Sequence, residues 1–107
     1  MPRWLSGILA RIRRLAADRR VLFTLKARQE LAGLECGLDE QDACDILASL
    51  MSEDSAGRLV SSTTGEWLYV FKPRVAGTVV YIKVLLWNEC VVVSFHEDRG
   101  GAHEEDS

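Results

Sequence analysis

The hydrophobic pattern of this chain changes its period once, near residue 58, and that change constrains the fold strongly. Before it, apolar residues recur three and four positions apart, as on one face of a helix. After it, apolar residues alternate with others, as in strands with one buried face. This order favours an α+β fold, with N-terminal helices packed on one face of a C-terminal antiparallel β-sheet. The chain has 107 residues, so we expect a single domain over 1–98 and a flexible acidic tail over 99–107.

Three segments show helical spacing. The first covers residues 2–17 and has a basic face rich in arginine. Thr24 is the predicted N-cap of a second helix that ends near Leu34. Asp39 is the predicted N-cap of a third, with Asp42 placed to complete a capping box. The apolar face of the third helix comprises Ala43, Ile46, Leu47, Leu50 and Met51.

The second half of the chain predicts strands. Segments of high β-propensity cover 66–72, 79–87 and 90–96, and a weaker one covers 59–63. Residues 52–57 predict a polar loop, and residues 21–23 are too few to assign.

Charge is distributed unevenly along the chain. The net charge is -3, yet residues 1–36 carry eight Lys or Arg against three acids. Residues 37–56 carry six acids and no base. An acidic chain is not typical of a general nucleic-acid binder, whose phosphate contacts need a cationic excess. A local basic surface is nevertheless available, so net charge neither supports nor excludes an RNA partner.

Other classes are disfavoured by what the sequence lacks. No apolar run reaches the ~18 residues of a membrane span, and no apolar secretory segment follows the N-terminus. The three cysteines, Cys36, Cys44 and Cys90, form no C-x-x-C pair. We therefore expect no disulfide framework, no metal site, no cofactor and a cytoplasmic location.

The last two predicted strands form a hairpin with an apolar face. Asn88-Glu89 suits a two-residue loop, and that loop fixes the register of the pair. In this register Val84 lies opposite Val93. The residues expected to face the core are Val80, Ile82, Val84, Leu86, Val91, Val93 and Phe95.

The other face of this hairpin gathers polar side chains. The same register sets Tyr81 opposite His96 and Lys83 opposite Ser94, with opposed Cβ atoms about 4.5–5.5 Å apart. One exposed patch is thus expected to hold a phenol, an imidazole, an amine and a hydroxyl.

Such a patch has the groups that RNA cleavage needs. Histidine can act as base or acid near neutral pH, and a cation can stabilise the phosphorane. The candidate cations are Lys83, Arg58, Lys72 and Arg74. An ordinary solvated sheet face remains the alternative interpretation, as does plain solvation for the basic helix face.

An ordered series of residues extends over most of the chain. The series comprises Gly37-Leu38-Asp39, Arg58, Trp67, Phe71-Lys72-Pro73-Arg74, Val80-Tyr81-Ile82-Lys83-Val84 and Val93-Ser94-Phe95-His96-Glu97. This series resembles a known family, the MqsR-like mRNA interferase toxins. The match runs from about residue 21 to residue 98 and is strongest in the final hairpin.

The resemblance implies a RelE-like fold and cleavage of single-stranded mRNA that needs neither ribosome nor metal. It also implies a cognate antitoxin, expected to be a helix-turn-helix DNA-binding protein. Site residues of the family are a Lys, a Gln, a Tyr and a second Lys. By position these correspond to the neighbourhood of Arg58, to Leu68, to Tyr81 and to His96. Leu68 is a departure, because an aliphatic side chain cannot take a polar role.

The leading hypothesis is therefore an endoribonuclease toxin of a type II toxin–antitoxin module. His96 is the expected general acid or base, Tyr81 the orienting or stacking group and Arg58 the phosphate stabiliser. The groups expected to guide the RNA backbone are Lys72, Arg74 and Lys83. The alternative is a non-catalytic protein-binding module of RelE-like fold, in which Leu68 marks a degenerate site.

Overall fold

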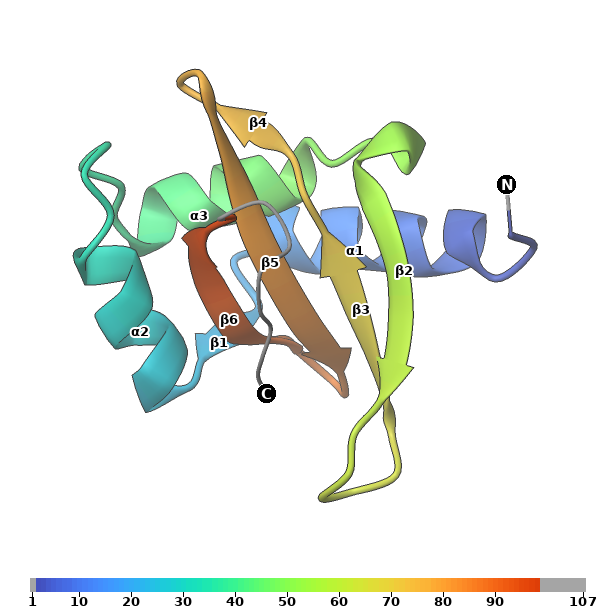
Figure 1. Cartoon of the computed structure of the whole chain (residues 1–107). Coiled ribbons are helices and arrows are strands. Elements are labelled where there is room, and N and C mark those ends of the chain that lie inside the picture. Colours follow the sequence, from blue (N-terminus) through green and yellow to red (C-terminus); the bar gives the residue numbers. More distant parts are fainter. Residues whose placement is uncertain (1, 99–107) are drawn as a thin grey trace.

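The computed structural model describes residues 2–98, so the predicted tail over 99–107 lies outside the described residues. Within this range the helices and a 3-10 turn precede most of a six-stranded sheet (Figure 1). The elements are α1 (Leu5–Ala17), β1 (Val21–Phe23), α2 (Leu25–Ala32), α3 (Glu40–Ala48), η1 (Ser52–Asp54), β2 (Ser55–Val60), β3 (Trp67–Phe71), β4 (Arg74–Val75), β5 (Thr78–Leu86) and β6 (Cys90–Glu97).

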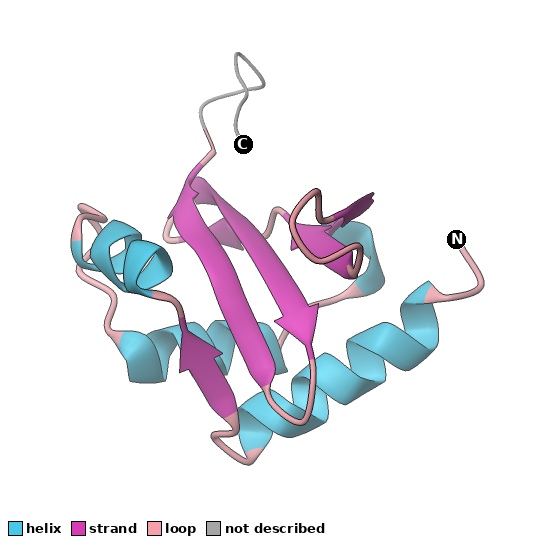
Figure 2. Cartoon of the chain, turned by 90° about the horizontal axis from the view of Figure 1, so that it is seen from below, coloured by secondary structure: helices cyan, strands magenta, loops and turns pink. Residues whose placement is uncertain are grey.

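The predicted α+β architecture is confirmed. The strands lie in the order β1-β6-β5-β3-β2, and β4 pairs with β5 alone. Figures 1 and 2 show α1 and α3 across one face of this sheet, while α2 lies beside β6. The sheet is mixed rather than purely antiparallel, because β1 pairs with β6 in parallel. Three residues are too few to show a period, so the sequence could not assign this strand.

The core lies between the sheet and the apolar stripe of α1. In α1, Leu9 and Ile12 are buried. Of the apolar face predicted for the third helix, Ala43, Leu47 and Leu50 are buried and Ile46 is partly buried, but Met51 follows α3 and is 52% exposed. The sheet contributes Phe71, Ile82 and Phe95, all without exposed surface. Burying one such side chain stabilises a fold by about 1.5–3 kcal/mol, so this layer fixes the sheet against the helices.

The predicted helix caps are confirmed. The Thr24 hydroxyl accepts a hydrogen bond from the backbone N–H of Ala27 at 3.1 Å and begins α2. Asp39 and Asp42 form the capping box that begins α3. The backbone N–H of Asp42 lowers the pKa of the Asp39 carboxyl, because the bond favours the carboxylate.

The prediction of a loop over 52–57 is wrong. That segment holds η1 and the start of β2, which begins at Ser55 instead of near residue 59. Pairing with β3 outweighs the weak strand propensity of these residues, since Ser55 lies opposite Phe71. Gly57 has φ +101 beside a register shift, a backbone geometry that disfavours other residues.

The arginines of α1 and the turn after it hold loops in place. Arg11 donates to the carbonyl of Trp87, and Arg20 donates to that of Asn88 at 3.0 Å. Both carbonyls belong to the loop between β5 and β6. Arg13 donates at 2.7 Å to a carbonyl that follows α3. These three basic side chains therefore satisfy backbone acceptors rather than forming a purely solvated face.

The β5–β6 hairpin departs from its predicted register near the loop. Val84 pairs with Val92 instead of Val93, so β6 contains one extra residue. This is a β-bulge at Val93, and it lengthens the loop to residues 87–89.

The bulge corrects two core assignments. Because a shift of one residue exchanges the faces of a strand, Cys90 and Val92 face the core and have no exposed surface. Val91 and Val93 were predicted there and lie outside the core cluster. Phe95, beyond the bulge, keeps its predicted core position.

This arrangement predicts selective thiol chemistry. Cys36 is exposed, while Cys44 and Cys90 are buried. Burial raises the pKa of both buried thiols, that of Cys90 to about 12, which leaves little thiolate at neutral pH. We expect iodoacetamide to alkylate Cys36 in the native protein and the others only in urea, as read by mass spectrometry. Fast native alkylation of Cys90 would contradict the bulged register, and Cys36→Ser serves as the control.

Candidate functional site

The sheet face opposite α1 and α3 carries the polar cluster that the hairpin register predicts. Tyr81 pairs with His96, and Lys83 pairs with Ser94. The phenol and imidazole rings are stacked, with centroids 5.0 Å apart and planes 11° from parallel. This part of the predicted register is confirmed, because the bulge lies between this end of the hairpin and the loop. We use the name open-face cluster for Tyr81, His96, Lys83 and Ser94 together with the neighbouring cations Lys72 and Arg74.

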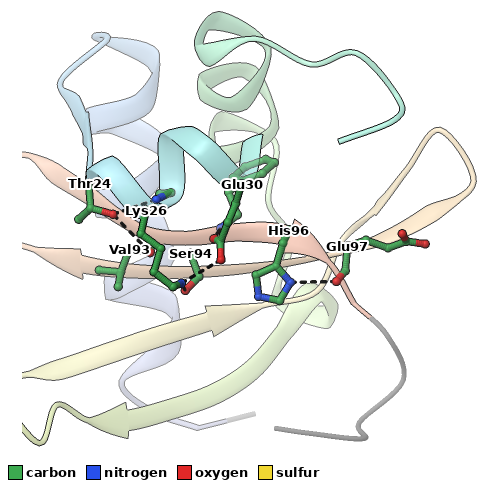
Figure 3. A network of polar contacts seen from close by, with 9 residues as sticks. Thr24, Lys26, Glu30, Val93, Ser94, His96 and Glu97 are labelled. Atoms are coloured by element: carbon green, nitrogen blue, oxygen red, sulfur yellow. Dashed lines mark hydrogen bonds and ion pairs between the residues drawn. The ribbon is translucent and has the colours of Figure 1, made fainter. Parts of the chain in front are cut away.

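One nitrogen of His96 has a defined role. Nδ1 lies 2.9 Å from the carbonyl oxygen of Glu97, as Figure 3 shows. A carbonyl oxygen only accepts, so Nδ1 must be the donor. In the neutral ring Nε2 then carries the lone pair. His96 is partly exposed, and this nitrogen is the one that can take up a proton.

Cationic side chains share the sheet face of the stacked rings. Lys72 Nζ lies 5.8 Å from the centroid of the Tyr81 ring and 3.7 Å from an Asp98 carboxylate oxygen. The carboxylate anchors this ammonium group beside the phenol. Lys83 is two residues from Tyr81 on β5, so the two side chains share a face. Arg74 of β4 is exposed at the end of the sheet, opposite a residue of β5 that shares the face of Tyr81.

The structure adds a cation that sequence reasoning missed. Lys26 of α2 donates through Nζ to the Ser94 hydroxyl at 2.9 Å and lies 3.0 Å from a Glu30 carboxylate oxygen. Ser94 is 2% exposed, so the contact covers it (Figure 3). The sequence shows that Lys26 and Glu30 are four residues apart and can form an ion pair on one helix face. It does not show that α2 lies along β6, and this tertiary contact is what brings both residues to the sheet face of Ser94.

Arg58 is not part of the open-face cluster. Its guanidinium lies 3.8 Å from the ring centroid of Trp67 and 4.7 Å from that of Trp4. Arg58 pairs with Tyr69, and directly opposed residues share a face. The Tyr69 ring is buried and contacts Trp4 on the side covered by α1. The structure therefore separates Arg58 from His96.

An aliphatic row crosses the same open face. Leu59 pairs with Leu68, Leu85 pairs with Val91, and Val91 pairs with Leu22. The β3–β5 register, continued by one residue, sets Leu68 opposite Leu85. Leu68 is thus one member of an apolar row two residues along the strands from Lys83, and it adds no polar group to the cluster.

The open face offers an imidazole, a phenol and several cationic groups for chemistry, whereas the Ser94 hydroxyl, predicted to be exposed, is buried beneath Lys26. Between residues 2 and 98, no three His, Cys, Asp or Glu side chains are grouped so as to hold a metal ion. No helix in that part of the chain is long and apolar enough to cross a bilayer.

Fold and cluster together define a class: a small α+β protein with a polar, cation-rich patch on the sheet face opposite α1 and α3. Residues 7–97 match the family described as "Motility quorum-sensing regulator, toxin of MqsA", and the chain belongs to this family of MqsR toxins. The resemblance predicted from the sequence is confirmed. Membership implies a toxin of a toxin–antitoxin module, with an antitoxin as partner. A comparison with curated proteins gives no match.

The position of Arg58 predicts a role in stability. We expect Arg58→Met to lower the free energy of unfolding by about 0.5–2 kcal/mol, because it removes a cation held between two indoles. Urea unfolding followed by tryptophan fluorescence measures this change. Arg74→Met is the matched control and should change stability by less than about 0.5 kcal/mol, since Arg74 is exposed. Unchanged stability in Arg58→Met would contradict the role.

Proposed function

We propose that this chain is an endoribonuclease toxin, an mRNA interferase that cleaves single-stranded mRNA without the ribosome and without a metal. The products are a 2′,3′-cyclic phosphate and a 5′-hydroxyl. The observation that carries the proposal is the stacked Tyr81–His96 pair, with the proton of His96 on Nδ1 and its lone pair on Nε2. Lys72 lies beside this pair, and Lys83 shares its sheet face, opposite α1 and α3.

The reaction needs one proton acceptor and one proton donor. The ribose 2′-oxygen forms a bond to phosphorus as its proton leaves, and the bond from phosphorus to the 5′-oxygen breaks as that oxygen gains a proton. Nε2 of His96 can take the first proton, and the resulting imidazolium can donate one. Tyr81 holds the imidazole plane by stacking, and its phenol suits a contact with a phosphate oxygen or a base.

The amines supply the positive charge that the reaction requires. Charge builds on the non-bridging oxygens as phosphorus becomes five-coordinate, and fixed cations stabilise it. Lys72 and Lys83 stand next to the ring pair, and Arg74 extends the cationic surface along the sheet. In this proposal Arg58 stabilises the fold and leaves phosphate binding to the open face.

A binding module without catalysis is the second candidate. The aliphatic row favours it, because Leu59 and Leu22 at its two ends are 49% and 53% exposed. Large exposed apolar side chains often mark protein contacts. In that case the antitoxin, expected to be a helix-turn-helix DNA-binding protein, would cover this face and Leu68 would mark a degenerate site.

Cleavage of a labelled natural mRNA in EDTA tests the proposed function. We expect wild-type protein to leave cyclic phosphate ends, identified by phosphatase and kinase treatment. His96→Ala should lower the rate by about 10²–10⁴-fold, the usual contribution of a positioned acid or base. Tyr81→Phe should lower it less, because the phenyl ring can still stack on the imidazole.

The controls separate the two candidates. Arg58→Met should cleave at the wild-type rate, since Arg58 lies on the other side of the sheet. Equal cleavage by wild type and His96→Ala would move the catalytic centre away from this face. No cleavage and no RNA affinity in folded wild type, with tight antitoxin binding, would favour the binding module.

A further inference from the structure

α2 is fixed to β6 at the bulge. The backbone N–H of Thr24 donates to the Val92 carbonyl at 3.0 Å, and its hydroxyl lies 3.4 Å from the Val93 carbonyl oxygen. Thr24 is also the N-cap of the helix. The first turn of α2 therefore has a fixed position along β6, next to the open-face cluster.

Lys26 stands in that first turn, where a cation opposes the helix dipole. Cations near a helix N-terminus are disfavoured by about 0.3–1 kcal/mol, and the first turn of α2 has no acidic residue. The order Lys26 then Glu30 is also the weaker orientation of such an ion pair. Within the helix only the ion pair with Glu30 favours a lysine here, and the same ammonium also contacts β6.

Polar contacts hold the ammonium over the sheet. Nζ of Lys26 donates to the Ser94 hydroxyl at 2.9 Å and pairs with Glu30 at 3.0 Å. The other Glu30 oxygen accepts from the backbone N–H of Phe95 at 3.0 Å, so the carboxylate is itself tied to β6. An ammonium has three donors, and the Lys26 side chain is 61% exposed. Two donors are used within residues 2–98, and the third can meet a ligand.

The position of Ser94 sets the relation of Lys26 to the stacked rings. Ser94 and His96 are two residues apart on β6 and share a face, and Ser94 lies opposite Lys83. Figure 3 shows Lys26, Ser94 and His96 on the same side of the strand. Lys26 therefore contacts the Ser94 hydroxyl from α2, and Lys83 is the residue opposite Ser94 on β5.

We propose that Lys26 binds a phosphate group of the RNA beside His96, the contact that the sequence assigned to Arg58. This inference rests on the proposed function. Ser94 and Glu30 position the ammonium, and its exposed side meets a non-bridging phosphate oxygen. In this proposal α2 contributes Lys26 to the RNA-binding site on the open face.

Binding of a single-stranded oligonucleotide with 2′-O-methyl riboses tests the inference without cleavage. Lys26→Gln should weaken binding about tenfold, as loss of a hydrogen bond to a charged group does. The slope of log affinity against log salt should become shallower by about 0.7, one phosphate contact on a single strand. Lys26→Arg should restore the slope, because it keeps the charge.

Arg28→Gln is the matched control. Arg28 is on the same helix, is 57% exposed and pairs with Glu40 at 2.7 Å, so its loss also removes one charge and one ion pair. We expect its salt slope to equal that of wild type. Equal losses in Lys26→Gln and Arg28→Gln would overturn the Lys26 site while leaving the proposed function standing. Failure of folded wild type to bind this oligonucleotide or cleave mRNA would overturn both.

Discussion

The bulge at Val93 is the constraint on which the rest of the structure depends. β6 must bury Val92 and Phe95 in the core, yet these residues are three apart and a regular strand would turn them to opposite faces. One extra residue resolves the conflict. Ser94 and His96 then stay together on the open face, opposite Lys83 and Tyr81. Without the bulge, Val91 and Val93 would take the core positions that Cys90 and Val92 occupy, as in the register predicted from the sequence.

The bulge also determines how the edge of β6 is covered. β1 pairs with only the first part of β6, so the later backbone groups need other partners. Thr24 donates to the carbonyls of Val92 and Val93, and Glu30 accepts from the N–H of Phe95. The residue before α2 and the Glu30 side chain thus bond to the edge of β6 where a neighbouring strand would otherwise pair. Because the same helix carries Lys26, covering the edge also places a cation at the cluster.

The sequence predicts the features that neighbouring residues determine, such as helix caps. It does not predict the bulge, because a run of identical residues shows no alternation of apolar and polar positions. The caps at Thr24 and Asp39 follow from side chains that bond to their own helices. The Tyr81–His96 pairing follows from the chemistry of two strands and a short connection. Residues 91–93 are three consecutive valines, so no alternation marks the bulge. The face of Arg58 depends on the pairing of β2 with β3, which the weak propensity of β2 does not define.

The distribution of charge in space explains how an acidic chain can present a local cationic surface, as the proposed function requires. The acids of residues 37–56 gather largely on α3, behind the sheet in Figure 1. Three of the N-terminal arginines, Arg11, Arg13 and Arg20, bond to loop carbonyls. Arg58 packs against indoles. Lys26, Lys83 and Lys72 carry positive charge on the sheet face of the stacked rings, and Lys72 lies beside the Tyr81 ring. Net charge averages over both faces, whereas a nucleic acid meets only one of them within a Debye length of about 10 Å.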